Sequence, residues 1–90
     1  MESYVVRATA DVGLPAVGPE LAVCLDRLTA ELGWWGAEPV QVAVRGDALG
    51  VVVAVGCLAS DPADASVEAL ELFTAALDGS GLDFADVRLA

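Results

Sequence analysis

Arginine, cysteine and tyrosine are the residue types in this chain that could carry chemistry. Guanidinium groups form bidentate contacts with carboxylate and phosphate groups, and three of the four arginines, Arg7, Arg45 and Arg88, fall in segments of alternating apolar and polar residues. The chain has no histidine, so it lacks the most common general base and metal ligand. The remaining candidates are carboxylates, Tyr4 and two thiols, and no nucleophile–base pair is recognisable among them. We therefore expect a protein that is not an enzyme.

The two cysteines, Cys24 and Cys57, are far apart in the sequence and form no CxxC pair. A structural zinc site needs about four nitrogen or sulfur ligands, and a secreted disulfide scaffold would contain more cysteine. The sequence predicts two reduced, buried thiols, no metal site and no cofactor.

Composition narrows the class of protein further. The chain has 90 residues, a formal charge of -10 and 57% hydrophobic residues, and its mean hydropathy is +0.65. These values exclude disorder and predict a single domain over residues 1–90. The excess of acids disfavours nucleic acid and anionic membranes as partners. The longest uncharged stretch, residues 48–60, is too short for a membrane helix.

The N-terminal residues and the amino-acid bias suggest where the protein is found. Met1-Glu2-Ser3 does not resemble a signal peptide, so we expect a cytoplasmic location. The chain contains no Lys, Ile, Asn or His but many Ala, Val, Gly and Asp residues, which suggests a GC-rich bacterial genome.

Four segments have the pattern of β-strands: residues 4–12, 39–45, 51–58 and 83–89. In the first, Tyr4, Val6, Ala8 and Ala10 fall on one face. In the second, Val40, Val42 and Val44 fall on one face, and we expect these faces of both strands to pack against helices. The third has almost no polar residue, as expected of a central strand. The turn Arg45-Gly46-Asp47 joins the second and third strands.

Two helices are expected between these strands. The first begins at Pro19 and ends near Gly33. The second begins either at Asp61, where Asp61 and Asp64 could cap it, or nearer Ser66, and it ends at Gly79. The apolar stripe of the first comprises Leu21, Cys24, Leu25, Leu28 and Leu32. That of the second comprises Val67, Leu70, Phe73, Thr74 and Leu77.

The resulting order is β-α-β-β-α-β. Two split βαβ units with right-handed crossovers give a four-stranded antiparallel sheet in the order 4-1-3-2, with both helices on one face. The architecture resembles the ferredoxin-like α+β fold.

The sheet face without helices should carry the binding residues. On the last strand we expect Phe84 and Arg88 there, with Ala85, Val87 and Leu89 against the helices. An apolar centre on the third strand would then be uncovered, and exposed apolar patches mark association or ligand sites. The candidate binding residues on this face are Arg7, Arg45, Val52, Ala54, Phe84 and Arg88.

The arginines of this face have two interpretations. In one, Arg7 and Arg88 pair across strands with Asp11 and Asp86 and stabilise the sheet. In the other, they form a cradle for a small anionic ligand. The first is favoured because acids stand beside the arginines.

Trp34 and Trp35 also have two interpretations. They could anchor a partner, since tryptophan is enriched at binding hot spots. Alternatively, one of them could plug the core at the end of the first helix.

Together these features predict a non-catalytic interaction module: a small acidic homodimer, or an accessory subunit of another protein, that associates through the open sheet face. One alternative is an acidic inhibitor or immunity-type protein that binds a basic partner through Glu68 and Glu71. Another is a regulatory domain that binds a small ligand.

Overall fold

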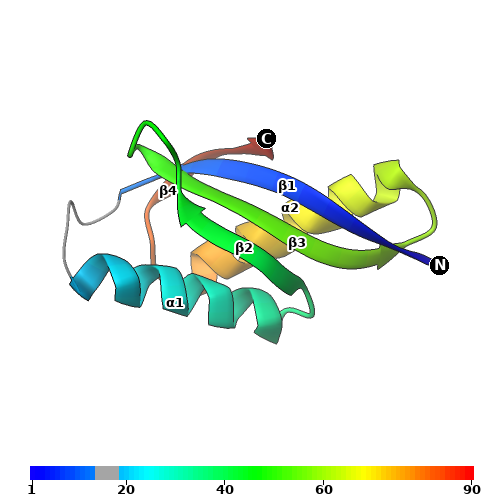
Figure 1. Ribbon diagram of the computed structural model, residues 1–90, viewed down its shortest axis with the longest axis horizontal. Helices are drawn as coiled ribbons and strands as arrows, with labels where there is room; N and C mark the ends of the chain where they lie inside the picture. Colours follow the sequence, from blue (N-terminus) through cyan, green and yellow to red (C-terminus); the bar gives the residue numbers. More distant parts are fainter. Residues whose placement is uncertain (14–18) are drawn as a thin grey trace.

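The computed structural model describes residues 1–13 and 19–90, which alternate strands and helices in the predicted order (Figure 1). The strands pair antiparallel in one sheet of order β2-β3-β1-β4, which is the predicted order read from the other edge. The fold is therefore ferredoxin-like. Its elements are β1 (Glu2–Val12), α1 (Pro19–Trp34), β2 (Glu38–Val44), β3 (Gly50–Ala59), α2 (Pro62–Gly79) and β4 (Phe84–Leu89).

Both helices pack on the same face of the sheet. In Figure 1, α1 runs alongside β2, while α2 crosses behind β1 and β3. The core between the layers contains Leu28 and Leu32 of α1, Phe73 of α2 and alternate residues of β1 and β3 such as Ala8 and Val53. This alternation confirms the predicted facing of β1. None of the described helices is long and apolar enough to cross a membrane.

Helix α2 begins at the earlier of the two predicted positions. Asp61 is its N-cap, and the Asp61 side chain accepts a hydrogen bond of 2.8 Å from the backbone N–H of Asp64. Pro62 occupies the first helical turn, where a missing N–H costs nothing because that donor has no partner within the helix. The pair Asp61-Pro62 therefore determines where this helix starts.

The buried stripe of α2 differs from the predicted one. Val67 is 57% exposed and Thr74 is also exposed. Alanines take their place in the interface, beside the two large buried side chains of the helix, Phe73 and Leu77. The buried residues of the helix are Ala65, Ala69, Phe73, Ala76 and Leu77.

Edge strand β2 contains a bulge. Pro39 pairs with Val55 and Gln41 with Ala54, so Val40 has no partner on β3. Val40 is 60% exposed, and its predicted place against the helices is wrong. Bulges and prolines on edge strands discourage further strands from pairing there.

Candidate functional site: the open face of the sheet

The sheet face opposite the helices holds three of the four arginines, as predicted. Arg7 pairs with Ala54 of β3, and Arg88 pairs with Thr9 of β1. Arg45, at the end of β2, reaches Thr9 and Asp11 on the same face. The three arginines do not form one cluster, however, because Arg7 lies farther along β1 than the other two.

Arg45 is the centre of an ionic network at the hairpin end of this face. Its Nη2 lies 2.5 Å from Asp11 Oδ1, and its Nε lies 2.9 Å from Asp47 Oδ1. Its Nη1 donates to Thr9 Oγ1 at 3.1 Å. Thr9 in turn donates to the Val51 carbonyl at 2.8 Å. Only 16% of the Arg45 side chain is exposed, so nearly all of its donors face protein.

The expected ion pairs are present only in part. Arg88 Nη1 lies 3.9 Å from Asp11 Oδ1, but it donates to the backbone carbonyl of Asp86, at 2.7 Å, rather than to the Asp86 carboxylate. Within the described part of the chain, Arg7 forms no ion pair. The Arg45–Asp11 contact was not predicted, because β2 and β1 are separated by β3.

Arg45 reaches across β3 at Gly50. The backbone N–H of Arg45 donates to the Gly50 carbonyl at 2.8 Å, and Gly50 is the residue of β3 that pairs with Asp11. Gly50 is thus the common neighbour of the two residues, and the Arg45 side chain spans β3 at this position.

The network sets the protonation behaviour of its two acids. Hydrogen bonds from the Arg45 guanidinium hold the pKa of the Asp11 and Asp47 carboxyl groups below their usual value. Since Arg45 is already shared between two carboxylates, this end of the face does not favour an anionic ligand.

The network predicts a pH-dependent contribution to stability. A carboxyl group with a lowered pKa in the folded state stabilises the fold above its unfolded pKa, about 3.9 for Asp. That contribution is lost as the pH falls through the folded pKa. We expect Arg45→Gln to lower the thermal midpoint at pH 7 and to flatten its decline below about pH 4. Thermal denaturation followed by circular dichroism over a pH series measures both effects.

Arg27→Gln is the matched control, because Arg27 is exposed on α1 and forms no ion pair with another described residue. The network interpretation is contradicted if Arg45→Gln and Arg27→Gln have the same pH profile.

The residues at the centre of the open face are covered by other side chains of the same chain. Ala54 is 3% exposed and Gly56 is buried, whereas Val52 is half-buried. The prediction of an uncovered apolar centre on β3 is therefore wrong. The reason is register: Arg7 and Gln41 flank Ala54, and longer side chains on β1 and β2 shield the small residues between them.

The exposed apolar side chains of this face lie at its other end. Val5 of β1 is 63% exposed and Leu58 of β3 is 62% exposed. This is the end of the sheet near the N-terminus, where β3 leads into α2 (Figure 1). Val5 and Leu58 were not among the predicted binding residues.

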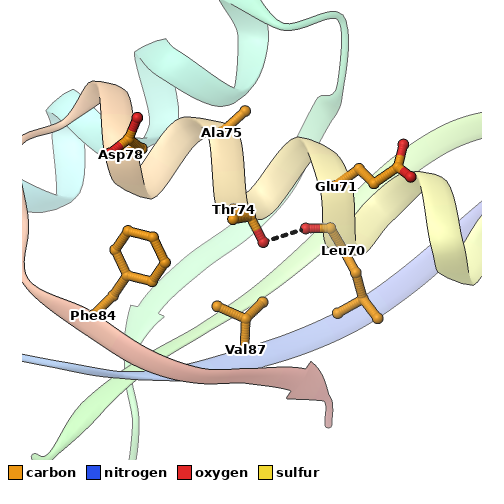
Figure 2. A pocket seen from close by; sticks show the side chains of 7 residues that line it. All are labelled: Leu70, Glu71, Thr74, Ala75, Asp78, Phe84 and Val87. Carbon is orange, nitrogen blue, oxygen red and sulfur yellow. Dashed lines mark hydrogen bonds between the residues drawn. The ribbon is translucent and has the colours of Figure 1, made fainter.

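Phe84 does not lie on the open face. It pairs with Val12, a core residue, and it faces α2 together with Val87 (Figure 2). An extra residue in β4 between the pairs Thr9–Arg88 and Asp11–Ala85 shifts the facing of the strand, and Asp86 has a φ of 54° there. Ala85, expected against the helices, therefore takes the position on the open face opposite Asp11.

Neither tryptophan plugs the core. Trp34, in the last turn of α1, is 81% exposed, and Trp35 is 48% exposed. Leu32 and Ala37 fill the core at this end instead, and the Ala37 N–H donates to the Leu32 carbonyl at 3.0 Å. The interpretation of the pair as a partner anchor stays a prediction.

Both cysteines are free, but only one is buried. The Cys57 thiol lies in the core and donates to the Ala65 carbonyl at 3.5 Å, and burial raises its pKa. Cys24 is half-buried, so the prediction of two buried thiols is correct for Cys57 alone. No three His, Cys, Asp or Glu side chains in the described residues are grouped to hold a metal ion.

No family model, curated protein or solved structure matches this chain.

Proposed function

We propose that this protein is a non-catalytic interaction module that forms a homodimer through the open face of its sheet. The observation that carries the proposal is the pair of exposed apolar side chains, Val5 and Leu58, on a face that no helix covers. Covering a fully exposed aliphatic side chain contributes roughly 1.5–3 kcal/mol. Two copies that meet face to face would bury four such side chains.

The shape of the face suits a second sheet. Gly56 and Ala54 form a shallow trough along β3, with Val5 and Arg7 on the β1 side and Glu38 and Gln41 on the β2 side. Sheets that pack face to face approach to about 10 Å, and small central residues permit this.

The charge distribution also favours this face. The chain carries a net charge of -10, but three of its four arginines lie on the open face. Helix α2 carries Asp64, Glu68, Glu71 and Asp78 and no basic residue. Two copies therefore repel each other least when their open faces meet.

The flanking charges suggest how the two copies would be oriented. Arg7 and Glu38 are exposed on opposite sides of the trough, and their partners on β3, Ala54 and Gly56, are two residues apart. A two-fold axis along the trough would bring Arg7 of each copy near Glu38 of the other, twice in one symmetric interface.

Leu58→Glu tests the proposal. A carboxylate in place of this apolar side chain would have to be desolvated in the interface without a partner, so we expect the dimer dissociation constant to rise at least about tenfold. Sedimentation equilibrium over a concentration series measures it. The matched control is Val23→Glu, which makes the same charge change at a site on α1 that is 63% exposed.

A charge exchange tests the orientation. Arg7→Glu and Glu38→Arg should each weaken the dimer, and the double variant should restore it. Wild-type protein that sediments as a 9.1 kDa monomer at all concentrations would contradict homodimer formation.

A further inference from the structure

A groove lies between α2 and edge strand β4 (Figure 2). Its volume is about 630 Å³, within the usual range of ligand sites. Its floor is apolar and comprises Leu70 of α2 with Phe84 and Val87 of β4, while Ala75 lines it from the outer side of α2 (Figure 2). Glu71 and Asp78 form its outer rim.

The polar groups of the groove are acceptors only. The Thr74 hydroxyl donates to the Leu70 carbonyl at 2.8 Å, so its proton is already used (Figure 2). Glu71 and Asp78 form no ion pair with any described residue. A molecule bound here would meet an apolar floor and two unpaired carboxylates, and would have to supply both apolar surface and positive charge.

Asp78 occupies an electrostatically unfavourable position. It lies near the C-terminus of α2, which ends at Gly79 and has no basic residue in its last turn. The C-terminal end of a helix is the negative end of its dipole and disfavours a carboxylate. A cation bound at the rim would relieve this repulsion.

From these features we propose that the groove binds a basic amphipathic helix of a partner protein. Glu71 and Asp78 are two helical turns apart, about 10.5 Å along the α2 axis. A partner helix lying along α2 presents residues seven positions apart with the same spacing. Lysine or arginine at those positions would meet the two carboxylates, and leucine-like residues between them would cover Phe84 and Val87.

Two other occupants fit less well. An extended peptide would have to pair with β4, but this edge is short and is interrupted at Asp86, where the backbone is left-handed. Residues on one side of a strand also repeat at multiples of about 6.8 Å, which does not match the carboxylate spacing. A second copy of the chain brings a net charge of -10 to an acidic rim.

A synthetic helix provides a direct test. The probe is a fluorescently labelled peptide of lysine, leucine and alanine, about 18 residues long so that it is helical in water. Lysines stand at every seventh position, with leucines three and four positions after each. We expect the fluorescence anisotropy to report saturable binding. A peptide with glutamate in place of lysine should not bind.

Variants locate the binding to the groove. Glu71→Gln and Asp78→Asn should each weaken binding about twofold to fivefold, the range of exposed ion pairs. Their controls are Glu68→Gln on α2, which lies off the groove, and Asp26→Asn on α1. Ala75→Arg, which places a cationic side chain beside Glu71 and Asp78, should weaken binding more than tenfold.

A second readout separates a binding role for Asp78 from a structural one. Asp78→Asn should raise the thermal midpoint while it weakens peptide binding, since it removes a charge that opposes the helix dipole. The proposal is overturned if the peptide does not bind. It is equally overturned if Glu71→Gln, Asp78→Asn and Ala75→Arg bind the peptide as tightly as their controls.

Discussion

Gly50→Ala is expected to destabilise this fold by about 3 kcal/mol or more, because the added methyl group has nowhere to go. A Cβ at position 50 would lie 2.0 Å from the carbonyl oxygen of Ala10 and 3.1 Å from the Cα of Asp11. Both are backbone atoms of β1, the strand that pairs with β3 at the centre of the sheet. Relieving the clash would require the two central strands to separate locally.

The same change would also disturb the Arg45 network, since Gly50 lies between Arg45 and Asp11. For a domain of this size the thermal midpoint should fall by more than about 10 °C. Gly46→Ala is the matched control: no atom lies within 4 Å of a Cβ built there. Equal midpoints for the two variants would show that β1 and β3 are not paired in this register.

Phe73→Ala has the other large expected effect. Phe73 is fully buried, and it is the largest such side chain in the described core. Truncating a buried phenylalanine costs about 3–5 kcal/mol, which combines lost transfer free energy with an unfilled cavity. We expect the urea midpoint to fall by a large fraction of its wild-type value while the slope of the transition stays unchanged.

Val67→Ala on the same helix is the control for Phe73→Ala. Val67 is 57% exposed, so its truncation should change stability by less than about 0.5 kcal/mol. A large loss at Val67 together with a small one at Phe73 would mean that α2 is rotated on the sheet and would contradict the observed packing.

Local chemistry accounts for what the sequence predicted correctly about the fold. Asp61-Pro62 marks the start of α2 because a capping carboxylate and a proline act within one turn. The alternation in β1 determines which of its residues face the core, and the apolar run of β3 marks a central strand. These signals depend on neighbours along the chain and require no knowledge of the partner strand.

The misplaced residues depend on contacts between distant segments. The bulge in β4 turns Phe84 toward α2, yet nothing near residues 84–86 marks the shift, because an aspartate can adopt a positive φ without a glycine. The predicted stripe of α2 differs from the buried one because alanine is only weakly hydrophobic, even where it forms the contact between the helix and the sheet. Each error reflects tertiary packing that outweighs local pattern.

The open face of the sheet could be predicted only in part from the sequence. The sequence placed Arg7, Arg45 and Arg88 on one face correctly, since strand alternation alone determines this. It could not show that Ala54 is covered by its neighbours, or that the exposed apolar residues are Val5 and Leu58. Exposure depends on strand order and on the length of the flanking side chains.

The association of two copies through the open face is tested most directly by methyl NMR on a dilution series from millimolar to micromolar concentration. We predict concentration-dependent chemical shifts for the methyl groups of Val5, Val52 and Leu58, and constant shifts for Val23 on α1. Constant shifts at Val5, Val52 and Leu58 throughout the series, or changes confined to Val23, would contradict the proposal.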